Sequence, residues 1–417
     1  MVNDERLNRE PVPDRFLGAC LISRWAFLAE SLVWRTWRAG ALLVTVISLG
    51  LFLYYRSSWG SSFGRSSSDG VLAVDAAAMA KMVPARVRPM VRPFLAKDSP
   101  EAVCISRVLQ QSWTESLTVP HCCHFLRLNG LDVCRHPRFS SGREIVNALT
   151  NQKSSETYFG EPIFFQTRSG IRYRDATNQK SFKGENHRDI CLATFAELGL
   201  PLSTPIKTVD ATFNLRDLLR DSVENFDLKQ RELTWTAVGF AIYLSPQRAW
   251  TNRYGESFTF DDLAKVLIQA NLEEASCGGA HLVYAMTILW RVDASDACLS
   301  EPVRDALTRC LRERITAIVE SQSKAGYWTL AWHTPGMEKS DAQRSSPHAP
   351  DSRLLATGHL LEWLELLPAE LQPPQDVYRR AARWLCGALQ ERLLVVSAVD
   401  FCPWIHAVCA VRTLVAE

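Results

Sequence analysis

The chain has 417 residues, of which 47% are hydrophobic and 22% charged, and its formal net charge at pH 7 is +2. This composition is typical of globular proteins with a sizeable buried core. The nearly balanced charge lacks the basic excess of nucleic-acid-binding proteins, so we expect no nucleic-acid partner. The 12 cysteines do not indicate a small disulfide scaffold, because a chain of this length can bury a core without such cross-links.

An uncharged apolar run extends from Ala39 to Tyr55 and predicts a single transmembrane helix. Trp34 and Trp37 precede it, as expected at a membrane interface. A Ser/Gly-rich tract follows at once, which disfavours a buried core helix, and a cleaved signal peptide would have a shorter preceding region. We therefore interpret residues 1–38 as a short N-terminal arm and residues 56–96 as a linker, first rich in Ser and Gly and then in Pro and Arg.

The orientation of this predicted span depends on its flanking arginines. Arg24, Arg35 and Arg38 precede it, whereas Arg56 and Arg65 follow it. The excess favours a cytoplasmic N-terminus and a globular domain on the extracytoplasmic side. The cysteines argue in the opposite direction, because free thiols are less common in exported domains. We expect a single-pass membrane protein and prefer the extracytoplasmic placement of its domain.

Helical patterns dominate residues 97–417, which we interpret as one domain. Six apolar segments alternate there with amphipathic ones that carry charge on one face. The apolar segments begin at His124, His187, Trp235, His281, His359 and His406. Several successive starts lie about 47 residues apart, an interval typical of a repeated pair of helices. Six such pairs can close into a ring, with the apolar helices inside and the amphipathic helices outside.

Two longer intervals between these starts indicate insertions. The segment from Glu161 to Arg174 predicts a small β-hairpin that turns at Ser169-Gly170. A polar loop from about residue 334 to residue 352 lengthens the interval before His359. The predicted fold is all-α: an (α/α)6 toroid of helix hairpins with a small β-hairpin insertion, preceded by one transmembrane helix.

The segment Gln322-Ser-Lys-Ala-Gly326-Tyr-Trp328 follows one of the amphipathic helices. It resembles the Gln-x3-Gly-x-Trp motif of terpenoid cyclases and protein prenyltransferases. The resemblance implies an α/α toroid in which Gln322 caps helix ends and Trp328 packs between neighbouring repeats. The catalytic motifs of these enzymes are not matched. Asp293-Ala-Ser-Asp296 lacks the spacing of the cyclase Asp-x-Asp-Asp acid, and the zinc ligands of the prenyltransferases do not align residue by residue. The resemblance therefore covers the scaffold and leaves the reaction open.

The histidines are the leading candidates for a functional site. If the inner helices run parallel, their first residues meet at one mouth of the ring. His187, His281, His359 and His406 are then candidate catalytic residues, with His124 as a further member. Helix N-termini would favour an anionic ligand there, and neutral imidazoles suit general-base catalysis or metal binding. The alternative is that each histidine only caps or packs at the start of its helix.

The segment Cys277-Gly-Gly-Ala-His281 suggests a zinc site. Cys277 and His281, four residues apart at a helix start, could share one ion with ligands from other repeats. The two glycines would let the backbone approach a ligand closely. The alternative is a glycine turn that only precedes an inner helix.

The remaining site candidates are weaker. His121-Cys-Cys-His124, with Cys134 and His136, lacks the paired Cys-x2-Cys spacing of structural zinc sites. Carboxylates near the predicted mouth either orient a histidine or belong to solvated helix starts: Glu185, Asp189 and Glu232. Aromatic residues of the inner helices either line a cavity or pack the core: Trp235, Tyr284, Trp363 and Trp404. An exposed outer-helix face is expected for three arginines: Arg379, Arg380 and Arg383.

Two functions are compatible with these residues. The first is an enzyme that acts on a lipid-like or glycan ligand at the histidine-lined mouth, with zinc as the one cofactor that the sequence suggests. The alternative is a non-catalytic binding or scaffold module of the cell envelope. No motif in the sequence is specific enough to name a reaction.

Overall fold

The computed structural model describes residues 89–110, 118–132, 138–176, 184–334, 349–392 and 401–416. The predicted transmembrane run at 39–55, the N-terminal arm and the linker before residue 89 lie outside these ranges. Among the helices within them, none combines the length and the apolar character needed to cross a membrane. The described part of the chain is mostly helical and has a few short strands, in agreement with the predicted all-α class.

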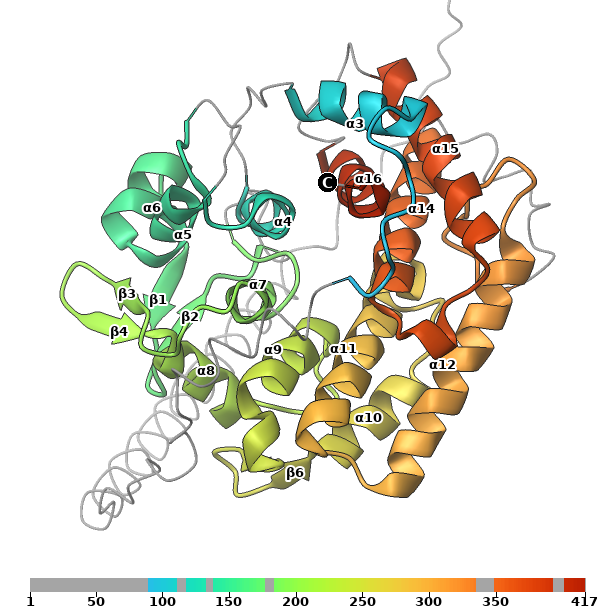
Figure 1. Cartoon of the computed structure of the whole chain (residues 1–417). Helices are drawn as coiled ribbons and strands as arrows, with labels where there is room; N and C mark the ends of the chain where they lie inside the picture. The colour runs from blue at the N-terminus through green and yellow to red at the C-terminus, as the bar shows by residue number, and fades with distance from the viewer. Residues whose placement is uncertain are drawn as a thin grey trace, which may run out of the picture. The chain divides into compact units, whose positions relative to one another are not determined.

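Six helices of the described ranges form a closed cycle of contacts (Figure 1). They are α4 (Val119–Asn129), α7 (Ile190–Glu197), α9 (Thr234–Leu244), α11 (Ala280–Asp296), α14 (Ala349–Leu366) and α16 (Phe401–Leu414). Each helix contacts the next in this order, and α16 contacts α4. Every residue of α9 is buried, which explains why its sequence is apolar on all sides. The six apolar segments predicted from the sequence correspond to these inner helices.

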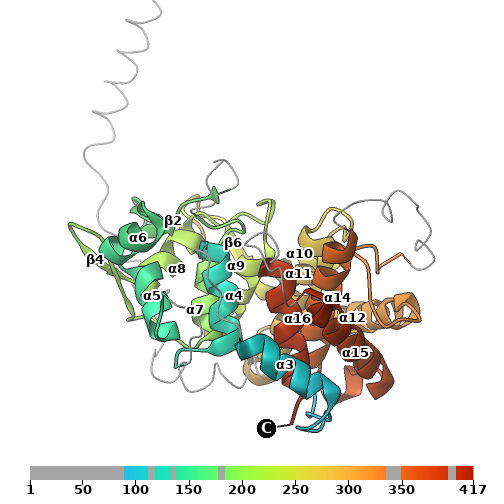
Figure 2. The ribbon, with the colours of Figure 1, turned by 90° about the horizontal axis from the view of Figure 1, so that it is seen from above.

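The amphipathic helices pack around this cycle (Figure 2). They are α3 (Pro100–Gln110), α5 (Gly142–Thr150), α6 (Gln152–Phe159), α8 (Leu215–Glu224), α10 (Phe260–Gln269), α12 (Glu301–Ser321) and α15 (Gln375–Arg392). Thus α5 contacts α4, α8 contacts α7, α10 and α12 contact α11, and α15 contacts both α14 and α16. Helix α3 contacts α15 and α16, which joins the start of the described chain to its end. Each outer helix buries one face and leaves the other to solvent.

Within the described ranges, three antiparallel β-hairpins and three short 3-10 helices connect the helices. The predicted hairpin is confirmed: β1 (Phe164–Gln166) pairs with β2 (Ile171–Tyr173). Two further hairpins were not predicted, β3 (Pro205–Lys207) with β4 (Thr212–Asn214) and β5 (Ala249–Thr251) with β6 (Ser257–Thr259). The 3-10 helices are η3 (Ser245–Gln247), η4 (Ser276–Gly279) and η6 (Ala369–Leu371). Hairpins β3–β4 and β5–β6 each lead from an inner helix to the next outer one.

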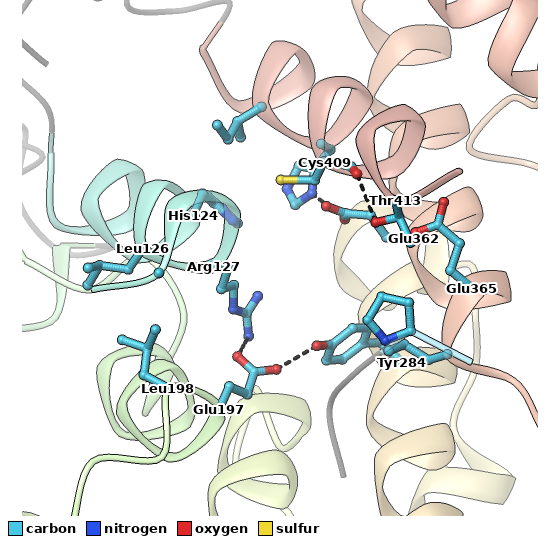
Figure 3. A pocket seen from close by; sticks show the side chains of 15 residues that line it. His124, Leu126, Arg127, Glu197, Leu198, Tyr284, Glu362, Glu365, Cys409 and Thr413 are labelled. Atoms are coloured by element: carbon cyan, nitrogen blue, oxygen red, sulfur yellow. Dashed lines mark hydrogen bonds and ion pairs between the residues drawn. The ribbon is translucent and has the colours of Figure 1, made fainter. Parts of the chain in front are cut away.

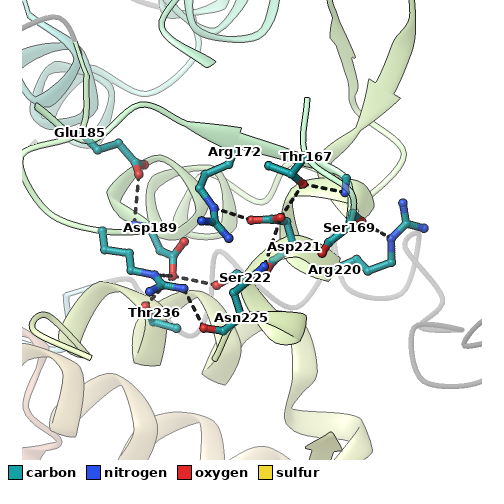
Figure 4. A network of polar contacts seen from close by, with 12 residues as sticks. Thr167, Ser169, Arg172, Glu185, Asp189, Arg220, Asp221, Ser222, Asn225 and Thr236 are labelled. Carbon is teal, nitrogen blue, oxygen red and sulfur yellow. Dashed lines mark hydrogen bonds and ion pairs between the residues drawn. The ribbon is translucent and has the colours of Figure 1, made fainter. Parts of the chain in front are cut away.

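A buried carboxylate ties the first hairpin to α8 (Figure 4). Asp221, which is 2% exposed, accepts hydrogen bonds from the Thr167 hydroxyl at 2.6 Å and from the Arg172 guanidinium at 2.6 Å. The Asn225 amide donates to the same side chain at 3.3 Å. A buried carboxylate is stable only when its lone pairs are satisfied in this way. These bonds therefore hold hairpin β1–β2 against α8, which packs on the inner helix α7.

We expect Asp221→Ala to lower the free energy of unfolding by about 2–4 kcal/mol, because it leaves the Thr167 hydroxyl and the Arg172 guanidinium without their acceptor. Urea denaturation of the full-length chain measures this loss. Asp132→Ala is the matched control, since Asp132 pairs with Arg143 at an exposed site and should change stability by no more than about 1 kcal/mol. Equal losses in the two variants would contradict a structural role for the buried carboxylate.

Gln322 and Trp328 join three helices, as the motif resemblance implies. The Gln322 amide donates to the Val377 carbonyl at 2.9 Å, which links the end of α12 to the first turn of α15. The indole of Trp328 donates to the Ile318 carbonyl at 2.8 Å, and its backbone amide donates to Thr357 on α14. Trp328 thus packs between α12 and α14, and Gln322 links the end of α12 to α15. Of the arginines expected on an exposed face, Arg380 instead donates to Gln322.

Candidate metal centre

Five histidines from different inner helices or their leading loops form one row inside the ring. Neighbouring ring centroids are 4.8 Å apart for His187 and His281, 4.9 Å for His281 and His359, and 3.5 Å for His359 and His406. His124 continues the row at 4.4 Å from His406. The predicted convergence of the histidines is confirmed, whereas their catalytic role stays a prediction.

The position of these histidines along their helices differs from the expectation. His187 precedes α7 and His281 lies at the start of α11, but His124, His359 and His406 lie well inside α4, α14 and α16. The prediction that every histidine opens its helix is wrong for these three, because at least one turn of the same helix precedes each of them. Helix N-termini therefore do not surround the cluster, and the expectation of an anionic ligand loses that support.

Two carboxylates each lie between two of the histidines. Glu232 is 2.7 Å from Nδ1 of His187 and 3.8 Å from Nδ1 of His281. Burial opposes the charge of Glu232, but its contacts with these two rings outweigh that effect and lower its pKa. Glu362 is 2.6 Å from Nδ1 of His406 and 3.9 Å from Nδ1 of His359. Each carboxylate can thus orient an imidazole and balance the positive charge of a bound ion.

Two cysteines complete sets of three ligand atoms. The ligand atoms of Cys277, His281 and His359 lie within 4.8 Å of one another, as do those of His124, Cys402 and His406. Two sets with a carboxylate meet the same limit: His187 with Glu232 and His281, and His359 with Glu362 and His406. The predicted pairing of Cys277 with His281 therefore gains a third candidate ligand from another repeat. Thiolate and imidazole ligands in such sets are characteristic of zinc sites.

A strained turn positions Cys277. In η4, Cys277 has φ 54°, Gly278 has φ 61° and Gly279 has φ 79°. A left-handed conformation is costly for a cysteine and persists only where the surroundings enforce it. A Cβ on Gly278 would lie 2.3 Å from the Leu330 carbonyl oxygen, and Trp332 donates to the Gly278 carbonyl at 2.7 Å. The two glycines were expected to let the backbone approach a ligand closely. Gly278 instead lies close to the backbone of the neighbouring loop at Leu330.

Burial keeps most of the clustered imidazoles neutral. It lowers the pKa of His281 to about 4 and lowers those of His124 and His359 well below their usual value, with neighbouring histidines adding to the effect. Burial also opposes the charge of His406, but Glu362 and Cys402 outweigh it and raise the pKa to about 9. Neutral imidazoles have a free lone pair, which is the form that binds metals.

Several buried ring nitrogens have no hydrogen-bond partner among the residues that the structure describes. They are Nδ1 of His281, Nε2 of His359 and Nε2 of His406. More than nine in ten buried polar groups in proteins are paired, so each exception needs a specific explanation. Three such nitrogens lie in one row beside two cysteines, so each has a lone pair available to a ligand.

Two cavities reach the row from its two ends. A cavity of about 210 Å3 is lined by His124, His406 and Glu362, together with Arg127 and Tyr284 (Figure 3). A second cavity of about 560 Å3 is lined by Glu232 and by polar residues of the loops before α7, α9 and α11, including Arg188, Gln230 and Asn271. Small molecules therefore have space beside both ends of the cluster.

The first cavity contains an ion pair that sequence reasoning did not identify. Arg127 of α4 pairs with Glu197 of α7, and the Tyr284 hydroxyl of α11 donates to the same carboxylate at 2.5 Å. The Arg127 guanidinium lies 4.1 Å from the ring centre of Trp235. Figure 3 shows Arg127 and Tyr284 both pointing toward Glu197. Of the aromatic candidates, Tyr284 thus lines a cavity.

Trp363 and Trp404 belong to the core. Trp363 is fully buried and donates to Thr287, and Trp404 packs near Phe401.

Other sequence candidates have structural roles. Glu185 accepts hydrogen bonds from the backbone amides of Asp189 and Cys191, and burial together with the Asp189 charge raises its pKa to about 8. Asp189 accepts hydrogen bonds from Ser222 and Thr236. His121 accepts from the Thr118 amide in a helix cap, so only His124 of its motif joins the cluster. Cys134 and His136 lie outside the described residues.

Burial lowers the pKa of His121 to about 4. This shift predicts that the contribution of His121 to the free energy of unfolding decreases in acid. The folded-state pKa lies below the unfolded value of about 6.5, so the stabilisation is present above pH ~6.5 and is lost as the pH falls toward 4. His121→Gln keeps an acceptor for Thr118 but does not titrate. We expect it to reduce the loss of unfolding free energy between pH 7 and 4.5 by about 1–2 kcal/mol, allowing for partial exposure.

Urea denaturation at both pH values measures this effect. His333→Gln is the control, because the His333 ring is less buried and its replacement should have a smaller effect. An unchanged pH dependence in His121→Gln would contradict the prediction.

Two members of the cluster, Glu362 and Cys402, were not predicted, because their spacing from the histidines indicates a shared helix face only when the helical register is known. Glu362 follows His359 by one helical turn, and Cys402 precedes His406 by the same four residues that separate Cys277 from His281.

Comparisons of this chain with protein-family models, with curated proteins and with solved structures found no match.

Proposed function

We propose that this chain is a metal-dependent enzyme built on an (α/α)6 toroid of the terpenoid cyclase and protein prenyltransferase type. The toroid is supported by the closed cycle of six inner helices with outer helices packed against them. Relation to that class is supported by the contacts of Gln322 and Trp328, which join α12 to α14 and α15. The reaction is a separate matter, since the catalytic motifs of those enzymes are not matched.

The proposed metal ligands are Cys277, His281 and His359, and zinc is the ion that suits them best. One thiolate and two imidazoles form a donor set typical of zinc. The observation that carries the proposal is the row of buried ring nitrogens without partners, at His281 and His359 in this set. A bound cation would also favour the thiolate of Cys277, whose pKa burial otherwise raises.

The proposed chemistry is hydrolysis of a polar bond in a lipid-like or glycan ligand. Three protein ligands leave a fourth position on zinc for water or substrate, as in catalytic zinc sites. Glu232 contacts His281 and also lines the cavity of about 560 Å3, so its carboxylate can accept a proton from water beside the ligand. The polar side chains of that cavity suit a ligand with several hydroxyl or amide groups.

The metal content of the full-length purified chain tests this proposal. We expect bound zinc in the wild type, loss of one equivalent in Cys277→Ser, and no loss in Cys310→Ser, a buried cysteine of the outer helix α12. Model ester, amide and glycoside substrates then test for turnover that a chelator abolishes and zinc restores. Wild-type metal content in Cys277→Ser would refute the site, and bound zinc without any such turnover would favour a binding module.

The chain is also proposed to be tethered to a membrane by residues 39–55, with its helical domain on the extracytoplasmic side. The support is the apolar run with its flanking aromatic residues and arginines. We expect the full-length chain to resist alkaline extraction from membranes and a variant that lacks residues 1–56 to be released. Extraction of both forms alike would contradict the anchor.

A further inference from the structure

Each of the two cysteines of the cluster lies four residues before a histidine of an inner helix. Cys277 and His281 are four residues apart at the start of α11, and His359 lies on α14, the next inner helix. Cys402 is the second residue of α16 and His406 lies four residues further along the same helix, while His124 lies on α4, the helix that follows α16 around the cycle. Each set brings its three ligand atoms within 4.8 Å of one another, and the two sets share no residue.

From this correspondence we infer that Cys402, His406 and His124 hold a metal ion of their own, separate from the ion proposed at Cys277. The inference rests on the proposed function for the nature of the centre, but it concerns different ligands. The ring interior is then a two-ion centre, with one Cys-His-His set from α11 and α14 and another from α16 and α4.

The hydrogen bonding of His406 supports a ligand role for that residue. Its Nδ1 is 2.6 Å from a Glu362 carboxylate oxygen, whereas its Nε2 is buried and has no partner among the described residues. A carboxylate that holds one ring nitrogen while the other binds the ion is the usual arrangement around zinc-bound histidine. His406 is only 3% exposed, so water does not readily replace the missing partner.

Cys402 and His124 face the same space as the free nitrogen of His406. The Cys402 sulfur is 3.9 Å from Nε2 of His124, long for a hydrogen bond but suitable for two ligands on one ion, since zinc binds sulfur at about 2.3 Å and nitrogen at about 2.0–2.1 Å. His124 is only 4% exposed. The three groups thus offer one thiolate and two imidazoles, the same donors as the first set.

The second set is the one that borders the smaller cavity. His124 and His406 line the space of about 210 Å3 that also contains Arg127 and Tyr284. An ion at this set would have its open coordination position toward that cavity. The first set includes His281, whose neighbour Glu232 borders the larger cavity near the other end of the row. The two ions would therefore serve opposite openings of the ring interior.

The test is a cobalt titration of the full-length chain after its metal has been removed with a chelator. Bound metal is counted directly, and thiolate-to-cobalt charge-transfer absorption reports cysteine ligands. We expect two equivalents in the wild type and one in Cys402→Ser, with about half of the charge-transfer absorption. Cys409→Ser is the matched control on the same helix, because Cys409 lines the same cavity but belongs to neither set. It should keep both equivalents.

The outcomes separate this inference from the proposed function. Loss of one equivalent in Cys402→Ser and of the other in Cys277→Ser supports both. If only Cys277→Ser loses metal, the second ion is refuted and the first stands; if only Cys402→Ser does, the first is refuted and the second stands. A wild type that binds no cobalt refutes both. If Cys402→Ser folds poorly, His124→Gln takes its place. A melting curve checks that His124→Gln is folded, and we expect it to bind one equivalent of cobalt.

Discussion

Replacing His281 by alanine should weaken metal binding at the Cys277 site by more than about 100-fold, since the loss of residues that merely orient zinc ligands already costs about 10–100-fold. His281 supplies one of three candidate ligands there and lies 3.8 Å from Glu232. Its removal leaves two protein ligands and deprives Glu232 of one histidine neighbour. Any chelator-sensitive turnover should fall with the loss of metal. Competition titration against a chromophoric chelator measures the affinity.

His333→Ala is the control for this substitution. His333 lies outside the row and contacts Thr334, so its removal should leave the chelator titration unchanged. The alanine at position 281 also creates a small cavity in the core, and a melting curve checks that the variant remains folded. A folded His281→Ala protein with wild-type metal affinity would contradict the assignment of this residue.

Trp328→Ala should produce the largest loss of stability, about 3–5 kcal/mol, the range found when a buried aromatic side chain is truncated. Trp328 is fully buried, and its indole donates to the Ile318 carbonyl near the end of α12. The alanine leaves a cavity between α12 and α14 and removes one of the hydrogen bonds that the Ile318 carbonyl accepts at the end of α12. Chemical denaturation of the full-length chain measures the loss.

Trp384→Ala is the matched comparison, because Trp384 on the outer helix α15 is only partly buried and packs near Tyr327. Its loss should be clearly smaller than that of Trp328→Ala. If the two substitutions lowered the free energy of unfolding by equal amounts, Trp328 would have no special role in joining the repeats.

The inner helices were predictable because a helix that is buried on every side has apolar residues on all of its faces. α9 reads TWTAVGFAIYL and is buried at each position, so its apolar character is independent of its neighbours. Hairpin β1–β2 was predictable from its alternating pattern and glycine turn. The other two hairpins were not, because most residues of their strands face solvent and give no alternating apolar pattern. Such strands pair because the helices on either side of the hairpin hold the ends of the strands close together.

The histidines of the site were predictable as a set, but their partners were not. Repeated apolar helices bring His187, His281, His359 and His406 together whatever their precise depth. Glu362 and Cys402 become ligand candidates only when the helical register around His359 and His406 is known. The contact of Arg127 with Glu197 joins two helices through their packing, and neither residue has a local signal. The order of the helices can be inferred from periodicity, whereas side-chain contacts across them cannot.

X-ray absorption at the edge of the bound metal tests the central claim most directly. Both proposed sites have one cysteine and two histidines, so the average environment is the same whether one or two ions are bound. We expect about one sulfur neighbour per zinc at about 2.3 Å and at least two nitrogen neighbours at about 2.0–2.1 Å. A spectrum of the loaded full-length chain with only oxygen and nitrogen neighbours would contradict a metal centre built on Cys277 and Cys402.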